Sequence, residues 1–332
     1  MYNGFYNFKE NPFSLSPDPA YLYMTVQHRE ALAGLIHGVC NRPGLTVLLG
    51  EAGTGKTTLL NVLVAWLEAR RYVPAICTNP TLTREELYDI LLTQMRVDCS
   101  SSLKSRQLAA LQQTLQRYRS EGRPAIFIID EAQRLPPELL EEIRLLMNLE
   151  TPREKLLEII LSGQPELEQI LRCTNLRQLK QRVGSICKLR TLTIDEVREY
   201  LNHRIEHTGV PNQTIFPEET IKAVHHLTDG IPRLINSLCN TALQIGFALE
   251  CHRLTTAIVY EAASDLDLIR DAGGQGATEL PTNEVADPAP SIRPVHNDKS
   301  TVGKNGDHTR VQDATNGQKH LTFLAGFLDR WR

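Results

Sequence analysis

The chain has 332 residues, of which 41% are hydrophobic, and its formal net charge is −3. This length predicts about two globular units of about 150 residues each, or one domain with an appended part. The small net charge excludes a protein that coats nucleic acid or membranes as a polycation, although it leaves room for a local basic face.

The cysteines and the N-terminus indicate the compartment. The seven cysteines are odd in number and form no CxxC pair, which argues against a disulfide framework or a zinc site. The N-terminal residues lack the basic-then-apolar order of a signal peptide, and no apolar run approaches the about 20 residues that span a bilayer. We therefore expect a protein without a transmembrane segment in the reducing cytoplasm, with peripheral attachment to the inner membrane as the alternative.

The first 192 residues alternate between strand and helix patterns. Residues 1–26 carry aromatic residues and prolines, and we expect them to form an irregular segment of this domain. Strands are expected at 45–49, 72–78, 125–130, 157–162 and 186–190. Helices are expected at 27–40, 57–70, 83–95, 103–120, 137–150, 166–171 and 176–183. This alternation predicts an α/β domain at residues 1–192, with a parallel sheet sandwiched by helices.

The strand pattern stops after residue 192. Helices expected at 195–207, 218–228, 232–249 and 255–266 predict a small all-helical lid domain at residues 193–268. Residues 269–319 have few large aliphatic side chains, so we expect a disordered linker. Residues 320–332 are expected to form a short amphipathic helix that docks on a protein or lipid surface, with a frayed tail as the alternative.

Residues 50–57 carry the strongest chemical signal. They read G-E-A-G-T-G-K-T, which matches G-x-x-x-x-G-K-[ST], between an expected strand and an expected helix. The glycines let the backbone wrap a phosphate, and the helix adds the positive end of its dipole. Lys56 is expected to reach the β- and γ-phosphates, and the Thr57 hydroxyl to ligate Mg²⁺. The predicted ATP contacts are Gly50, Glu51, Ala52, Gly53, Thr54, Gly55, Lys56, Thr57 and Thr58.

A second signal ends the strand expected at 125–130. The apolar run I-F-I-I is followed by Asp130 and Glu131, which is the Walker B arrangement. Because parallel strands end at one edge of a sheet, these acids should lie near the phosphate loop. Asp130 is expected to hold the Mg²⁺ shell and Glu131 to polarise the attacking water.

Polar residues in the next loops complete the predicted site. Gln164 follows the strand expected at 157–162 and is predicted to orient the water; Ser162 is its rival, and a loop Gln that caps the next helix is the plain alternative. His28 and its helix, with the aromatic segment, are expected to shape an adenine pocket, unless they only pack in the core.

Arginines at two places are expected to act on phosphate. Arg182 lies just before the last expected strand and is predicted to project into the ATP site of a neighbouring subunit, with Arg177 as the alternative. Arg233 opens a helix of the lid domain and is predicted to reach the γ-phosphate of its own subunit. The competing interpretation of each is a solvated surface arginine.

Several of these motifs together resemble one family. They are P-F-S-L-S-P-D-P at 12–19, H-R-E-A-L at 28–32, the loop at 50–57, D-E-A-Q at 130–133, G-Q-P-E-L at 163–167, Q-R at 181–182 and G-I-P-R-L-I-N at 230–236. The chain resembles the ExeA/GspA-type AAA+ ATPases, which are bacterial secretion proteins with relatives in exosortase and exopolysaccharide loci and among TnsC/TniB-like transposition regulators. The resemblance runs from residue 1 to about residue 268.

The resemblance implies roles and partners. It implies a homo-oligomeric ring or filament, with Gln164 as sensor 1, Arg182 as the arginine finger and Arg233 as sensor 2. After residue 270 the sequence departs from the secretion member, which continues into a membrane helix and a periplasmic region that we do not expect here.

The leading functional prediction is an ATP-hydrolysing assembly or energising factor for envelope export, either general secretion or an exosortase/exopolysaccharide system. Its partners would be components of that system. One alternative is a DNA-associated ATPase that regulates transposition, which the near-neutral charge does not favour. Another is a slow nucleotide-dependent switch.

Overall fold

The computed structural model describes residues 2–14, 23–79, 81–152, 154–173, 176–209 and 215–269. The chain divides into two units, residues 1–269 and 270–332, and every described residue belongs to the first. The linker predicted at 269–319, apart from Ile269, and the terminal helix predicted at 320–332 therefore lie outside the described residues.

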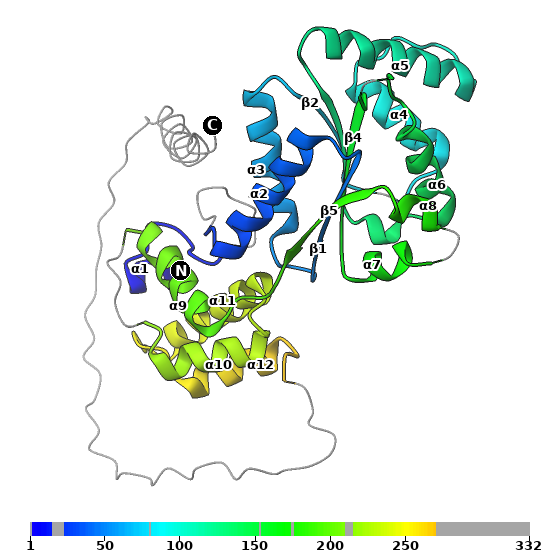
Figure 1. Cartoon of the computed structure of the whole chain (residues 1–332). Coiled ribbons are helices and arrows are strands. Elements are labelled where there is room, and N and C mark those ends of the chain that lie inside the picture. The colour runs from blue at the N-terminus through cyan, green and yellow to red at the C-terminus, as the bar shows by residue number, and fades with distance from the viewer. Residues whose placement is uncertain are drawn as a thin grey trace, which may run out of the picture. The chain divides into compact units, whose positions relative to one another are not determined.

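A parallel sheet forms the centre of the first domain (Figure 1). Among the described residues, five strands pair in the order β2-β3-β4-β1-β5, and every neighbouring pair is parallel. Their bounds are β1 Leu45–Gly50, β2 Val73–Cys77, β3 Ala125–Ile129, β4 Leu157–Gly163 and β5 Val183–Leu189. The predicted α/β fold with a parallel sheet is confirmed.

Helices cover both faces of this sheet. Figure 1 places α2 and α3 on one side, and α4, α5 and α6 on the other. The bounds are α2 Val26–Asn41, α3 Lys56–Ala69, α4 Arg84–Gln94, α5 Lys104–Ser120, the 3₁₀ turn η2 Ala132–Arg134, α6 Pro137–Leu146, α7 Glu166–Leu171 and α8 Arg177–Lys180. All residues of β3 are buried, which explains its unbroken apolar run in the sequence.

The open edge of β2 is closed by a side chain. Pro74 has no N–H to offer, and Ile76 is the other residue of β2 whose backbone faces outward. The Gln94 amide accepts from the Ile76 N–H at 2.6 Å and donates to the Ile76 carbonyl at 2.7 Å. This pairing mimics a neighbouring strand and protects the edge from pairing with another chain.

The second domain is helical, as expected. It contains α9 Ile194–His207, α10 Glu218–Thr228, α11 Pro232–Ala248 and α12 Thr256–Asp265. Thr193 and Glu196 form a capping box at the start of α9, so the helix begins immediately after the last α/β segment.

The N-terminal aromatic segment differs from expectation in two ways. Tyr2–Tyr6 form a short helix, α1, where we expected an irregular segment. Residues 1–26 were expected to belong to the α/β domain, but Tyr2, Tyr6, Phe8 and Phe13 are buried in the core of the helical domain. The Tyr2 hydroxyl donates to Asn240 Oδ1 at 2.6 Å, and the Tyr6 hydroxyl to the Cys251 carbonyl at 2.9 Å. The segment is therefore hydrogen-bonded to α11 and to the loop after it.

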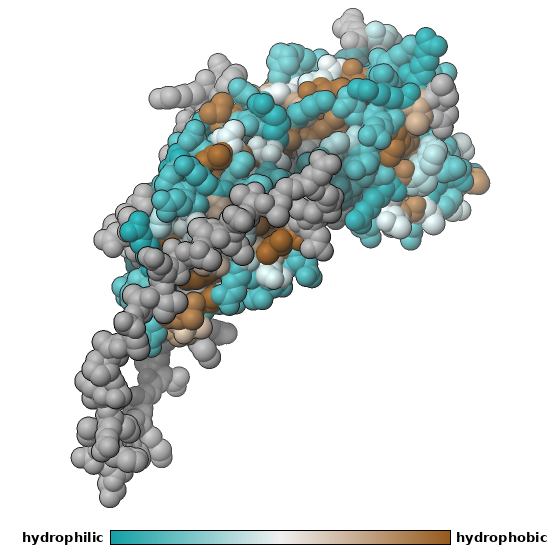
Figure 2. Space-filling view, turned by 90° about the horizontal axis from the view of Figure 1, so that it is seen from below, coloured by the Kyte–Doolittle hydropathy of each residue, from teal (hydrophilic) through white to brown (hydrophobic). Residues whose placement is uncertain are grey.

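The surface of the described residues is mixed. Figure 2 shows hydrophilic residues that surround separate hydrophobic patches on the face in view. Within the part of the chain that the structure describes, no helix has the length and apolar character to cross a bilayer.

Candidate nucleotide-binding site

Two glycines in the loop between β1 and α3 stand where a side chain would not fit. Gly53 and Gly55 have φ of +82° and +95°, values that L side chains rarely adopt. A Cβ at Gly53 would lie 2.8 Å from the Arg233 Cβ, and one at Gly55 would lie 3.2 Å from His28 Nε2. The first N–H groups of α3 have no partner inside the helix, so the loop and the helix together offer donors to an anion.

Lys56 is held inside this loop. Its residue surface is 4% exposed, and Nζ donates to the carbonyls of Gly50 at 2.8 Å and Glu51 at 3.0 Å. Burial lowers the pKa of Lys56, and the neighbouring Glu131 and Asp130 carboxylates oppose this effect. An ammonium has three donors, so one stays available for a phosphate oxygen.

Asp130 is the hub of the acidic end of β3. Oδ2 accepts from the Thr57 hydroxyl at 2.7 Å, and Oδ1 accepts from the Ser162 hydroxyl at 2.7 Å. The Glu131 N–H also donates to Oδ1, at 3.0 Å. The structure therefore brings Thr57 and Asp130 together as oxygen donors of the kind that Mg²⁺ prefers.

Glu131 and Gln164 face the same cavity, which has a volume of ≈ 580 Å³ and lies between the two domains. This size suits a nucleotide-sized ligand. The cavity is lined by Ser14, Tyr23, His28, Ala52, Gly53, Thr54, Gly55, Lys56, Thr57, Thr58, Glu131, Arg134, Gln164, Leu192, Tyr200, Arg204, Pro232, Arg233 and Asn236. Of the two rivals in this loop, Gln164 lines the cavity, whereas Ser162 is fully buried and supports Asp130.

The helical domain touches the phosphate loop directly. The Arg233 N–H donates to the Gly53 carbonyl at 3.3 Å, and the exposed Arg233 side chain lines the cavity. The Leu192 N–H donates to the Gly230 carbonyl at 2.8 Å, and a Cβ at Gly230 would lie 2.1 Å from the Leu192 carbonyl oxygen. Gly230 thus allows the close backbone approach that sets α11 against the loop.

His28 supports the loop from the other side. Its Nε2 lies 3.1 Å from the Thr54 carbonyl, and its Nδ1 lies 2.8 Å from the Thr25 hydroxyl. Burial lowers the pKa of His28, which favours a neutral ring that donates from Nε2 and accepts at Nδ1. His28 and Tyr23 line the cavity, while the predicted adenine pocket stays a prediction.

Arg182 lies far from its own phosphate loop. It precedes Val183, which pairs with Leu45 at the beginning of β1, whereas the loop follows Gly50 at the other end. Arg182 helps lower the pKa of the Glu150 carboxyl, after the larger effect of Lys155. Neither Arg182 nor Arg177 lines the cavity, so the structure does not bring the predicted arginine finger to the site of its own subunit.

Some residues that line the cavity were not predicted from the sequence. Arg134, Tyr200, Arg204 and Asn236 line the cavity, and the Tyr200 hydroxyl donates to Asn236 Oδ1 at 2.8 Å. Asn236 is the last residue of the motif at 230–236, so this motif could have indicated its place at the site. Tyr200 and Arg204 lie in an ordinary amphipathic helix, so their place follows only from the packing of the domains.

A larger cavity, of ≈ 960 Å³, lies at the opposite ends of β2 and β3 and contains none of the predicted site residues. Its arginines are Arg71, Arg96, Arg117 and Arg123, and they flank the C-terminal ends of α3, α4 and α5. Cations there stabilise the carbonyl ends of helices, which accounts for them without a ligand.

Comparisons with known proteins agree with this geometry. The family described as an AAA domain matches residues 36–171. General secretion pathway protein A of Aeromonas hydrophila is 39% identical over 274 residues, which are 82% of this chain and 50% of that protein. The chain belongs to the GspA-type AAA+ proteins. It spans half the length of this relative, so the activity and partners of the longer protein do not transfer to it directly.

Solved structures show the same fold for this GspA-type chain. Cdc6p from Pyrobaculum aerophilum superposes with a TM-score of 0.59 and 16% identity, over 76% of this chain and 70% of that one. ORC2 of Aeropyrum pernix, in ADPNP-ADP complexes, gives a TM-score of 0.55 and 16% identity, over 77% of this chain and 72% of that one. At this identity the likeness is one of fold.

Proposed function

We propose that the chain binds Mg-ATP and hydrolyses it to ADP and phosphate. The observation that carries this proposal is that Lys56, Thr57 and Glu131 line one cavity, and that Thr57 is hydrogen-bonded to Asp130 behind it. Residues from the end of β1, the start of α3 and the end of β3 meet there at hydrogen-bonding distance.

Each residue of this set has a distinct task. Lys56 and the amides at the start of α3 bind and orient the phosphates. Thr57 and Asp130 are the residues that would hold Mg²⁺, whose bound charge offsets that of the phosphates. Glu131 accepts a proton from water at the cavity wall, and Gln164 orients that water.

Binding at this cavity would couple to the helical domain. Arg233 offers a cation to the γ-phosphate from α11, while its own N–H holds the Gly53 carbonyl. A ligand that contacts both domains favours the arrangement in which both contacts form, so nucleotide occupancy biases their relative position.

We also propose that Arg182 acts between subunits. Its place at the opposite end of the sheet from its own phosphate loop supports a role in the site of a neighbouring copy, in a ring or filament. Arg177 is the alternative donor on the same short segment.

The proposed role in export rests on sequence similarity to a secretion protein. The likeness to general secretion pathway protein A supports an assembly or energising factor for envelope export, in the cytoplasm or at the inner membrane. General secretion and exosortase/exopolysaccharide export both fit it. The DNA-associated alternative stays a prediction, because the likeness to origin-recognition proteins is one of fold.

Steady-state hydrolysis tests the enzymatic proposal. The unaltered protein should release phosphate from Mg-ATP, and Glu131→Gln should lower turnover by about 100-fold or more, as expected for loss of a general base. Glu138→Gln, an exposed acid at the start of α6, is the control and should match the unaltered protein. Normal turnover in Glu131→Gln would remove Glu131 from the chemistry, and turnover far below ~1 s⁻¹ in the unaltered protein would favour the nucleotide switch.

A further inference from the structure

The side-chain amide of Gln133 joins two parts of the site. Its Nε2 donates to Glu131 Oε2 at 2.8 Å, and its Oε1 accepts from the Gln164 N–H at 3.1 Å. A carboxylate only accepts and a backbone N–H only donates, so the two partners fix which end of the amide faces each of them. Gln133 therefore links Glu131 to the turn that carries Gln164.

The surroundings leave Gln133 little freedom. It lies in the 3₁₀ turn η2, which is anchored by the fully buried Ala132. A Cβ at Gly163 would lie 2.7 Å from Gln133 Oε1, so the absence of a side chain at the end of β4 is what lets the amide approach. The link therefore depends on Gly163 at the end of β4 and on the turn η2, which follows β3.

Glu131 depends on this contact. Its backbone is left-handed, with φ of +54°, a conformation that a non-glycine residue keeps only when its surroundings hold it. Two described cations act on its carboxylate: Lys56, whose pKa Glu131 raises, and Arg134, whose Nε lies 3.9 Å away and whose side chain is 62% exposed. Within the described residues, Gln133 makes the short hydrogen bond to that carboxylate.

We infer that Gln133 is a positioning residue that holds the Glu131 carboxylate at the cavity wall and ties it to the β4–α7 turn. This inference rests on the proposed function, in which Glu131 serves the attacking water. Gln133 itself does not line the cavity. Its removal should therefore slow turnover and leave the binding of Mg-ATP intact.

A purely structural role of Gln133 predicts a different effect of its removal. If Gln133 only braced η2, its loss would lower the melting temperature and weaken binding and turnover together. The division between turnover and affinity thus separates the two interpretations.

The experiment uses the full chain and two substitutions. Gln133→Leu removes both hydrogen bonds, whereas Gln133→Glu keeps the acceptor toward Gln164 but places a like charge beside Glu131. Gln169→Glu, on the exposed face of α7, is the matched control. For each protein, kcat for Mg-ATP, the calorimetric Kd for Mg-ATP and the melting temperature are measured.

Both Gln133 variants should lower kcat by about 10- to 100-fold, the range of one hydrogen bond to a charged group. Their Kd should stay within about two-fold of the unaltered protein, because Gln133 does not line the cavity and its loss removes no contact with the ligand. If Gln133→Leu does not fold, Gln133→Glu decides alone, since it keeps the size of the side chain.

Two results would overturn the inference by itself: kcat within two-fold in Gln133→Glu, or a joint loss of kcat, affinity and melting temperature. An unaltered protein that binds Mg-ATP without hydrolysing it would instead overturn the proposed activity and the inference with it. Selective loss of kcat in an active protein supports both.

Discussion

Glu158 shows how a single residue can make stability depend on pH. It lies in β4 and is 5% exposed, with Oε2 accepting from the Gly44 N–H at 2.8 Å and Oε1 buried without a described partner. Burial raises the pKa of this carboxyl to about 7, although the Gly44 N–H and the charges of Arg42 and Lys155 oppose the shift. Below about pH 7 the folded protein therefore holds this carboxyl mainly in its protonated form.

The sign of the effect follows from proton binding. Between pH 4.5 and about 7 the folded state holds this proton more tightly than the unfolded state, so the free energy of unfolding falls as pH rises through that window. The loss from this one group is on the order of 3 kcal/mol and is complete above the folded pKa.

Urea unfolding at pH 5 and pH 8 checks this, with Glu158→Gln against the unaltered protein. The unaltered protein should lose more stability between these pH values than the variant, while an exposed control, Glu206→Gln, should behave like the unaltered protein. Equal losses in all three would show that Glu158 titrates normally.

At the same scale, the motifs predicted several of the residues that meet at the candidate site. Lys56, Thr57, Asp130 and Glu131 were predictable because each motif fixes its residues within one strand and one loop. Gln133 was not, because its role needs the β4–α7 turn beside it, and that meeting comes from strand order. Arg233 and Gln164 line the cavity as expected, but their chemical roles stay predictions.

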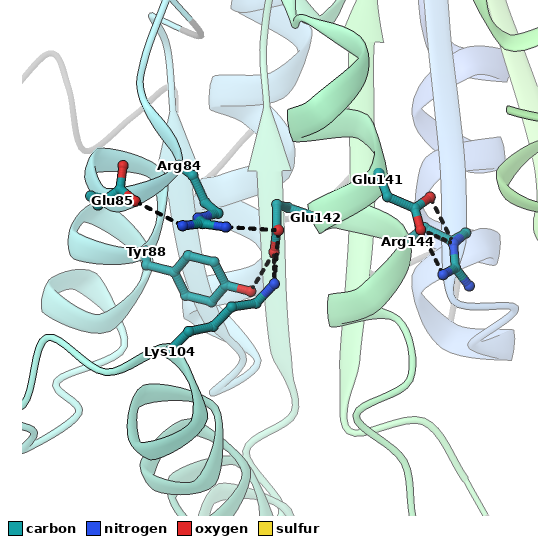
Figure 3. Close-up of polar contacts among 7 residues, drawn as sticks. All are labelled: Arg84, Glu85, Tyr88, Lys104, Glu141, Glu142 and Arg144. Atoms are coloured by element: carbon teal, nitrogen blue, oxygen red, sulfur yellow. Dashed lines mark hydrogen bonds and ion pairs between the residues drawn. The ribbon is translucent and has the colours of Figure 1, made fainter. Parts of the chain in front are cut away.

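At the scale of elements, a buried acid holds α4, α5 and α6 together (Figure 3). Glu142 on α6 accepts from the Tyr88 hydroxyl of α4 at 2.9 Å and pairs with Lys104 of α5 at 2.7 Å. Burial, and next the hydrogen bond to Glu142, raise the pKa of Tyr88. The neighbouring acid Glu141 instead pairs with Arg144 on its own helix, at the surface (Figure 3).

These adjacent acids allow a matched comparison. Glu142→Ala should lower the free energy of unfolding by about 2–3 kcal/mol, because it leaves the buried Tyr88 hydroxyl without its partner. Glu141→Ala makes the same change in the same helix and should cost less than about 1 kcal/mol, since surface ion pairs contribute little. Chemical denaturation of both variants measures the difference, and equal costs would refute the role given to the buried cluster.

The element boundaries show where sequence patterns lose information. Buried strands such as β3 were predictable, because burial on both faces requires an unbroken apolar run. Strand β5 begins at Val183, where the last residue of a helix was expected and the strand only from residue 186, because an edge strand with Gly184 and Ser185 carries no apolar signal. The helix expected at 137–150 ends at Leu146, and a bridge between Glu150 and Lys155 follows.

At the scale of the whole molecule, the parallel sheet lies between the loop after Gly50 and Arg182. Strands β1, β3 and β4 end at the phosphate loop, Asp130 and Gln164, whereas β5 begins directly after Arg182, beside the start of β1. A copy that presents its Arg182 end to the cavity of the next copy would complete one site with residues from two chains, which is the arrangement that we propose for a ring or filament.

Mixing variants tests this arrangement. Arg182→Ala subunits keep an intact cavity but lack the arginine, and Glu131→Gln subunits keep the arginine but lack the acid. Each variant alone should therefore be nearly inactive. Mixtures should regain part of the turnover of the unaltered protein, because an intact cavity then meets an intact arginine. Arg198→Ala, which breaks only exposed pairs with Asp195 and Glu218, is the control for loss of an arginine. Absence of rescue at every ratio would contradict action between subunits.

The proposed binding of Mg-ATP against the backbone of residues 50–57 is tested most directly by a calorimetric titration of the full chain. The unaltered protein should bind Mg-ATP, Lys56→Ala should bind at least about 10-fold more weakly, as for loss of one charge-assisted contact, and the exposed control Lys222→Ala should bind normally. A folded protein that shows no binding of Mg-ATP, or a Lys56→Ala variant that binds it as tightly as the unaltered chain, would contradict the account.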